Sequence, residues 1–301
     1  MPVVRFLAAR VAGIVIALCA VVAVAYIIMF FAPGGPYSSL AVTHPEMIVP
    51  SLVQGTIQTV RDMMTFHLQV PPRFFMQAFS ISFTLAMGSL LIAAAIGLPL
   101  GVFAAVKARH WLAPVATLAG LIAQGMPPYT VAFYLQLVFG VFIPILPLHG
   151  WGGPSYAILP MCALAAANIG YFTKFMQAGM NQALRQDYLV SAKARGLPGW
   201  RLVLRHALRP ALVSVVTFFG PQTAMVIANT VVVETLFQIP GMSSVFHYTL
   251  SALGQPMGPG TQGDMHAAIA SLFVLSILVM LLNLLVDILY RALDPRLGWS
   301  S

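Results

Sequence analysis

The chain has 301 residues, of which 59% are hydrophobic and only 7% are charged, and it carries a formal net charge of +8. Soluble domains carry roughly a quarter charged residues, so a water-exposed surface on this chain would be covered with apolar patches. The composition therefore excludes an ordinary soluble protein and indicates a membrane protein. A basic chain can bind nucleic acid, but this requires a basic face on a soluble fold, and we expect no nucleic-acid partner.

Six stretches reach the length of about 20 apolar residues that a helix needs to cross a bilayer. They cover residues 11–31, 78–106, 112–145, 156–175, 211–237 and 267–290. The first could be a signal peptide, because Arg5 and Arg10 precede it and Ala23-Val24-Ala25 offers a cleavage site between small residues. Its apolar run continues to Phe31, however, which is longer than a usual signal h-region and favours a retained anchor helix.

The basic residues are distributed unequally between the two sides of this six-span arrangement. Only Arg61 and Arg73 lie on one side. The other side holds Arg5, Arg10, Lys107, Arg109, Lys174, Arg185, Lys193, Arg195, Arg201, Arg205, Arg209, Arg291 and Arg296. The positive-inside rule assigns the richer side, with both termini, to the cytoplasm of a multi-pass protein.

The segments on the outer side are residues 33–77, 147–155 and 238–266, which we predict to be loops because they are rich in polar or turn-forming residues. Within the spans, Gly97-Leu98-Pro99-Leu100-Gly101 and Gly125-Met126-Pro127-Pro128 are expected to kink their helices. We interpret both as packing features in preference to a substrate site. Cys19 and Cys162 lie in apolar runs, so we expect small buried hydrophobes there, and the scattered histidines predict no metal site.

The most informative segment is residues 179–210, between the fourth and fifth spans, which is too polar to cross the membrane. Its composition favours a helix up to Arg195, with an apolar stripe every fourth residue at Met180, Leu184, Tyr188 and Ala192. Gly196 then predicts a helix end, and Pro198-Gly199 follows as a turn.

A second short helix is predicted after this turn, with Trp200, Val203, Leu204 and Ala207 on one face. Arg201, Arg205 and Arg209 would lie on the opposite face. The segment is thus predicted to be a helix–turn–helix elbow on the cytoplasmic side. It could lie on the bilayer with its arginines on anionic lipid, or it could dock a partner protein through its small residues, and the residues alone leave both alternatives open.

The pattern Asp-Tyr-x-x-x-Ala-x-Ala-x-Gly-Leu at residues 187–197, followed by His206-Ala207-Leu208-Arg209, resembles the cytoplasmic "EAA" loop of ABC importer permeases. The dipeptide, oligopeptide and nickel group of these permeases is the most similar. Further resemblances cover Phe31 to Pro36, Gly97 to Val102, Val231 to Gly241, Asn283 to Tyr290 and Leu293 to Arg296. They extend over essentially the whole chain.

The resemblance implies an all-α membrane protein with six transmembrane helices, in the type I ABC importer permease architecture with a coupling-helix elbow between helices 4 and 5. In this family the elbow docks on a cytoplasmic ATPase, and a substrate-binding protein delivers cargo on the outer side. The implied docking residues are Asp187, Tyr188, Ala192, Lys193, Arg195 and Gly196. The implied function is transport of di- or oligopeptides, with nickel or another small ligand as the alternative.

The implied partners are a second homologous permease subunit forming a heterodimer, two ABC ATPase subunits, the binding protein and membrane lipid. No G-x-x-x-x-G-K-[ST] phosphate loop occurs in the chain, so we expect ATP and magnesium to be bound by the separate ATPase subunits and no enzymatic activity here. We expect no cofactor in this chain.

Polar residues of the fifth span are candidates for lining the translocation path. Glu234 is the leading intramembrane charge, although it could lie hydrated at the interface. Gln222, Asn229 and Thr230 could face the path or join helices, and Asn283 and Asp287 are interpreted as structural. An ion-coupled secondary transporter would need ionisable residues deep in several helices, and an intramembrane enzyme would need a catalytic constellation. The sequence favours neither.

Overall fold

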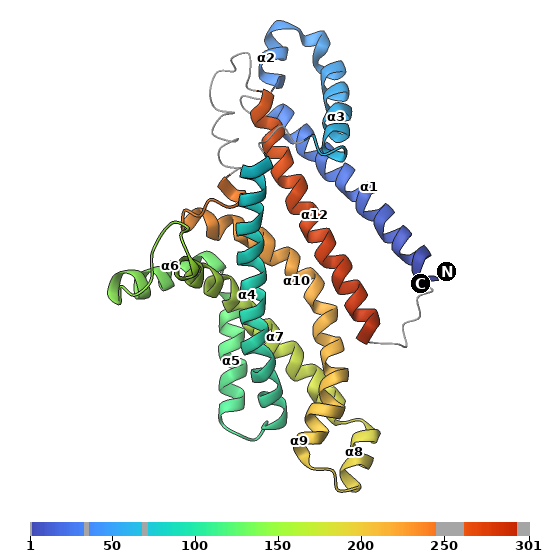
Figure 1. Cartoon of the computed structure of the whole chain (residues 1–301), viewed down its shortest axis with the longest axis vertical. Helices are drawn as coiled ribbons and strands as arrows, with labels where there is room; N and C mark the ends of the chain where they lie inside the picture. The colour runs from blue at the N-terminus through green and yellow to red at the C-terminus, as the bar shows by residue number, and fades with distance from the viewer. Residues whose placement is uncertain (1, 33–35, 68–71, 245–261, 294–301) are drawn as a thin grey trace. The chain divides into compact units, whose positions relative to one another are not determined.

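The computed structural model describes residues 2–32, 36–67, 72–244 and 262–293. Within these ranges all regular secondary structure is helical, which confirms the predicted all-α class (Figure 1). Parts of the predicted outer segments 33–77 and 238–266, and the family resemblance after Leu293, lie outside the described residues.

The chain divides into two compact units. The first comprises residues 1–82 and 240–281, and the second comprises residues 83–239 and 282–298. The helices of the first unit are α1 (Pro2–Phe31), α2 (Pro36–Thr43), the 3₁₀ helix η1 (Pro45–Met47), α3 (Ile48–Met64), the start of α4 (Pro72–Val106) and most of α12 (Gln262–Leu293). The second unit holds the rest of α4 and the helices that follow it up to residue 239.

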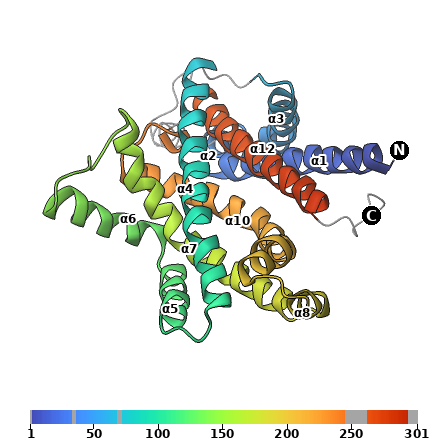
Figure 2. The same ribbon diagram turned by 60° about the horizontal axis from the view of Figure 1, so that its bottom comes forward.

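The helices of the second unit pack mainly around α7 (Pro154–Leu184). Its neighbours are α5 (Leu112–Gly125), α6 (Pro128–Gln136), the π-helix η2 (Leu137–Phe142) and α10 (Leu208–Leu236). Between α7 and α10 lie α8 (Asp187–Ala194), α9 (Gly199–Arg201) and the π-helix η3 (Leu202–Ala207). Figure 2 shows α7 running between α5 and α10, with α8 where the chain turns from one long helix to the other.

The first unit has a core of large apolar side chains contributed by α1, α3 and α12. Phe30, Met63, Ile269 and Phe273 are almost completely buried in it. The ring of Tyr26 on α1 contacts the backbone of α3 at Gly55, so the two helices approach closely (Figure 1).

Helix α3 differs from the loop predicted for this part of the outer segment 33–77. The reason is visible in its spacing: Leu52, Val60 and Met63 pack against the core of the first unit, and Thr59 is also buried. Residues spaced three, four and seven apart share one face of a helix, so the segment folds by covering apolar side chains of its neighbours. Its polar residues masked this pattern in the sequence.

Three described helices are long and apolar enough to cross a membrane: Ala8–Phe31, Met76–Val106 and Pro154–Leu184. Shorter apolar helices cover Leu112–Gly125, Pro128–Phe142, Gln222–Leu236 and Ala268–Leu281. The chain is therefore a membrane protein with several apolar helices, and the count of six spans stays a prediction.

The stretch 112–145, predicted as a single span, is interrupted after Gly125. Met126 and Pro127 both have extended backbone conformations, with ψ of 122° and 142°. Each of them precedes a proline, and a residue before a proline avoids the helical region because the proline ring would clash with it. The two prolines therefore end α5 and start α6 at Pro128, where a helix tolerates proline well. By contrast, α4 continues as helix through Pro99.

Glycines set the closest helix contacts of the second unit. A Cβ atom added to Gly97 would lie 2.7 Å from the Ile169 carbonyl oxygen, and one added to Gly101 would lie 2.5 Å from the Thr173 carbonyl oxygen. The two glycines are four residues apart on α4 and share one face of the helix. Because they have no side chains, the backbone of α7 packs directly against this face. The packing interpretation of Gly97 to Gly101 is the one that these contacts support.

The substitution Gly101→Ala should lower the stability of the fold by about 1–3 kcal/mol, because the added methyl group overlaps the backbone of α7 and not the end of a flexible side chain. The measurement is the thermal unfolding midpoint of the purified chain in detergent. Gly13→Ala is the matched control, since no atom lies within 4 Å of a Cβ at that helical position. Equal midpoints for the two variants would contradict the close α4–α7 contact.

Candidate functional site

The α7–α10 connection, residues 185–207, contains the elbow predicted from the sequence. The structure divides it differently from the prediction: α7 ends at Leu184, a turn follows at Arg185 and Gln186, and α8 starts anew at Asp187. The turn is closed by the Gln186 N–H donating to the Ala183 carbonyl at 3.1 Å. A carboxylate in the first turn of a helix is favourable, so Asp187 suits the start of α8.

Because of this turn, the predicted apolar stripe is not continuous. Tyr188 is 46% exposed, whereas its neighbour Leu189 is 4% exposed and takes the buried position. Ala192 is also buried, three residues after Leu189. Leu189 and Ala192 thus hold α8 against η3 and α7, which are its contacts in the second unit.

The end of α8 is shaped by Gly196, as the sequence predicted. Its φ is +81°, a left-handed conformation that glycine adopts without strain. The N–H of Leu197 donates to the Ala192 carbonyl at 3.4 Å across this residue. A glycine in this conformation, spanned by such a bond, is the Schellman arrangement that ends many helices.

Besides Tyr188, the outer surface of α8 carries side chains that are small or polar. Asp187, Ser191 and Ala194 are exposed, as are Arg195 and Gly196 just after the helix. Lys193 belongs to α8, but the structure does not describe its side chain. Of the six docking residues implied by the family, Ala192 faces inward, so it positions the helix and does not form part of its surface.

The helix after the turn matches its predicted face only in part. Of the predicted residues, Ala207 is buried and Val203 half-buried, whereas Trp200 and Leu204 are exposed. Leu202, which was not predicted, is also buried. Residues 202–207 form a π-helix, in which hydrogen bonds span five residues, so inward positions recur at a longer interval than the prediction assumed. The Arg201 guanidinium lies 5.1 Å from the centre of the Trp200 ring, a cation–π contact at the surface.

Two polar side chains join α7 and α10 within the second unit. The Nε2 of Gln222 donates to the Oδ1 of Asn168 at 2.9 Å, and the Nδ2 of Asn168 donates to the Leu164 carbonyl at 2.7 Å. Asn168 is buried and Gln222 half-buried. Gln222 therefore makes an interhelical hydrogen bond, one of the two alternatives that the sequence left open for it.

Glu234 is fully buried near the end of α10. The chain folds back behind it, because the Ile239 N–H donates to the Glu234 carbonyl at 2.8 Å. The Gly150 N–H also donates to the Phe237 carbonyl at 2.9 Å, which ties residues 147–155 to the end of α10. Asn229, a further path candidate, is half-buried on the same helix.

Sequence reasoning missed the partner of Gln222 and the anchoring role of Leu189. No local signal marks Asn168, because it is 54 residues away along the chain. Leu189 carried a signal of burial, because it is an apolar residue three positions before Ala192 and so shares a helix face with it. The assumption of one unbroken helix through residue 195 concealed it.

The apolar helices and the connection between α7 and α10 define an integral membrane protein that presents a small, partly charged surface at one end of a helical unit. Residues 97–299 match the family described as binding-protein-dependent transport system inner membrane component, and the chain belongs to that family. It is therefore a component of a transport system in the inner membrane, as the resemblance predicted.

Individual relatives are similar over most of the chain. The dipeptide transport system permease protein DppB of Bacillus subtilis is 33% identical over 221 residues, which cover 73% of this chain and 68% of the relative. The oligopeptide transport system permease protein OppB of Haemophilus influenzae is 30% identical over 224 residues, or 74% of this chain and 70% of the relative.

A solved structure supports the fold. The crystal structure of an amino acid ABC transporter with histidines contains a chain that matches with a TM-score of 0.50 and 14% identity. The match covers 75% of this chain and 95% of that one. At this identity the likeness concerns the fold alone.

The variant Gly196→Ala should destabilise the end of α8 by about 1–2 kcal/mol, since an L-residue with a Cβ is strained in the left-handed region. We expect faster hydrogen exchange at the Leu197 amide, and Gly196→Asn should cost less because asparagine tolerates this conformation. Gly199→Ala is the control, because a Cβ there meets no atom within 4 Å. Similar exchange in Gly196→Ala and Gly199→Ala would exclude the capping role.

Proposed function

We propose that this chain is the transmembrane subunit of an ATP-driven ABC importer that moves di- or oligopeptides from a binding protein across the cytoplasmic membrane. The observation that carries the proposal is the identity of 30–33% to dipeptide and oligopeptide permeases over 73–74% of the chain. The match extends over most of the relatives, so it concerns the transport subunit as a whole and not a single shared motif.

In this proposal the α7–α10 connection docks on an ATPase subunit. Two features support it: the outer surface of α8 carries small exposed side chains that let a protein approach closely, and the helix is held from behind by Leu189 and Ala192. Asp187, Tyr188, Lys193, Arg195 and Gly196 would form or border the contact. ATP binding would close the ATPase pair and move α8, which biases the transporter between inward- and outward-facing states.

The translocation path would follow α10. Gln222 and Asn229 are seven residues apart, so they share one face of this helix, and both are half-buried. Glu234 would lie near the outer end of the path, and because an ionisable residue within a membrane span is costly to bury, its presence there points to a function. The Gln222–Asn168 hydrogen bond would hold the wall of the path together and orient the Gln222 amide.

The remaining subunits follow from the family. A second, related permease would complete a heterodimer, two ATPase subunits would bind ATP and magnesium, and the binding protein would contact residues 33–77 and 238–266. Six spans with both termini in the cytoplasm are supported by the distribution of Lys and Arg.

The docking role predicts that Ala194→Arg abolishes transport-coupled ATP hydrolysis without unfolding the chain. Ala194 is exposed, so the larger side chain costs the subunit little, but it would keep the ATPase from approaching. The measurement is ATP hydrolysis by the reconstituted transporter with its binding protein and peptide, and we expect a decrease of at least about tenfold. Ala9→Arg, an equal change at an exposed position of α1 outside the proposed contacts, should retain activity.

Two results would contradict this role of α8. The first is full hydrolysis in Ala194→Arg with the ATPase still bound. The second is an equal loss in Ala9→Arg, which would mean that any added arginine disturbs the transporter.

The substrate class is tested in the same liposomes. Addition of a di- or oligopeptide with the binding protein should stimulate ATP hydrolysis and uptake, whereas nickel should stimulate neither. Stimulation by nickel and not by peptides would retain the importer class and overturn the peptide assignment. Uptake driven by an ion gradient without ATP would overturn the class itself.

A further inference from the structure

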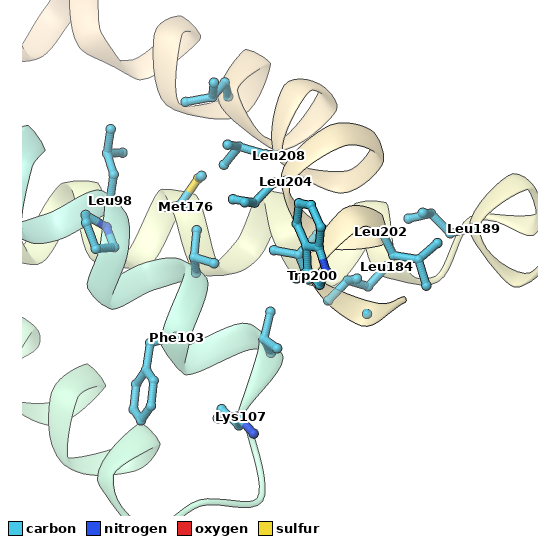
Figure 3. Close-up of a pocket in the computed structure, with 16 residues that line it drawn as sticks. Leu98, Phe103, Lys107, Met176, Leu184, Leu189, Trp200, Leu202, Leu204 and Leu208 are labelled. Carbon is cyan, nitrogen blue, oxygen red and sulfur yellow. The ribbon is translucent and has the colours of Figure 1, made fainter. Parts of the chain in front are cut away.

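A large apolar groove lies in the second unit between the end of α4, α7 and the helices on either side of η3 (Figure 3). Its volume is about 1310 Å³, above the range of roughly 300–1,000 Å³ that is usual for small-molecule pockets. It is lined by Leu98, Pro99, Val102, Phe103, Val106, Lys107, Met176, Leu184, Leu189, Gly199, Trp200, Leu202, Val203, Leu204, Leu208 and Leu212.

The lining has the character of a site for a long apolar molecule. Fifteen of the residues that line it are uncharged and mostly aliphatic, and Lys107 is the one charged residue among these described side chains. The groove is open on one side, because Val106 is 42%, Trp200 63% and Leu204 58% exposed. Figure 3 shows Lys107 and Phe103 on one margin of the groove and Leu208 on the opposite margin.

A second, cationic hollow adjoins the groove at this margin. It is lined by Val106, Lys107, Ala108, Arg109 and His110, so it shares Val106 and Lys107 with the groove. The His110 ring lies 5.9 Å from the Phe103 ring, centre to centre, and Phe103 lines the groove. The turn that carries Arg109 and His110 is thereby folded back against the apolar surface.

The depth of this margin in the membrane follows from α4. Its apolar span ends at Val106, and the charged turn begins at the next residue, so the cationic hollow lies at the membrane–water boundary. Trp200, which lines the groove, and Trp111, which follows His110 of the cationic hollow in the sequence, are both largely exposed. Exposed tryptophans are typical of this boundary, where the indole meets both the headgroups and the acyl chains.

We propose that this groove binds an anionic phospholipid, with its acyl chains along α4 and α10 and its phosphate at Lys107 and Arg109. An apolar trough that ends in two cations at the boundary matches the division of a lipid into chain and headgroup, and basic pockets between membrane helices bind anionic headgroups in this way. A peptide substrate would leave its backbone polar groups unpaired along the aliphatic lining.

The same site would link the bilayer to the α7–α10 connection. Leu189 of α8 and Leu202 of η3 line the groove, and both are buried residues that position the connection. A bound acyl chain would fill the space beside them. The anionic lipid content of the membrane would then influence how firmly α8 is held.

The test is native mass spectrometry of the full chain in detergent, titrated with dioleoyl phosphatidylglycerol or with zwitterionic dioleoyl phosphatidylethanolamine. We expect one phosphatidylglycerol per chain to bind more tightly than phosphatidylethanolamine. Lys107→Gln with Arg109→Gln should weaken its binding by roughly tenfold or more, since both cations face the phosphate. Arg61→Gln with Arg73→Gln, which removes the same charge from exposed positions elsewhere, should leave binding unchanged.

The acyl-chain part of the site has its own matched pair. Leu204→Gln should weaken binding several-fold by placing an amide in the groove, while Leu118→Gln should not, although Leu118 on α5 is equally exposed at 59%. Each of these side chains is exposed, so the variants should fold.

Four results would overturn the proposal. Equal affinity for the two lipids would show that the headgroup is not recognised, and equal effects of the two charge pairs would exclude this location. Displacement of the lipid by inorganic phosphate, with no effect of Leu204→Gln, would indicate a site for free phosphate. Loss of the lipid when the whole transporter is assembled would indicate that a protein partner fills the groove.

Discussion

The close approach of helices at glycine positions is the constraint on which the second unit depends. Lipid chains are as apolar as leucine, so burial of apolar surface contributes little to helix association inside a bilayer, and close van der Waals contact has to replace it. Gly97 and Gly101 give this contact between α4 and α7, and Gly120 and Gly170 give it between α5 and α7. Gly179 does the same beside Ala211 of α10, where an added Cβ would lie 2.7 Å from the Ala211 carbonyl oxygen. Helix α7 is thus fixed against three neighbours through positions without side chains.

Much of the fold was predictable because the bilayer allows few alternatives. A lipid-exposed backbone must satisfy its hydrogen bonds internally, so a long apolar run has to be a helix. The interruption at Met126 and Pro127 was predictable as a kink, because each residue precedes a proline. That it separates two helices completely was not predictable. Helix α3 could not be recognised from polarity, because the side chains that it packs against, such as Tyr26 of α1, are distant from it in sequence.

The α7–α10 connection was predictable where one residue decides the backbone and less so where periodicity was extrapolated. Gly196 ends α8 in a left-handed conformation that glycine adopts without strain. A glycine at this position can be read directly from the sequence. The buried face after residue 200 depends on the wide turn of η3, and the sequence pattern of a π-helix cannot be told from that of an α-helix by counting every third or fourth residue. Likewise, Asn168 is the hydrogen-bond partner of Gln222 because α7 and α10 pack side by side, which the local sequence does not show.

The joints of α9, η3 and α10 contain no loop. The residues at the two junctions, Leu202 and Leu208, have helical backbone angles, so residues 199–236 form one uninterrupted rod. At about 1.5 Å per residue this rod is on the order of 50 Å long. A rod of this length acts as a lever: a tilt of about 10° at Trp200 displaces the Glu234 end by roughly 9 Å if the rod stays rigid. The widened turn of η3 sets the axial rotation of the rod, so a single-residue deletion there would turn every side chain of α10 by about 100°.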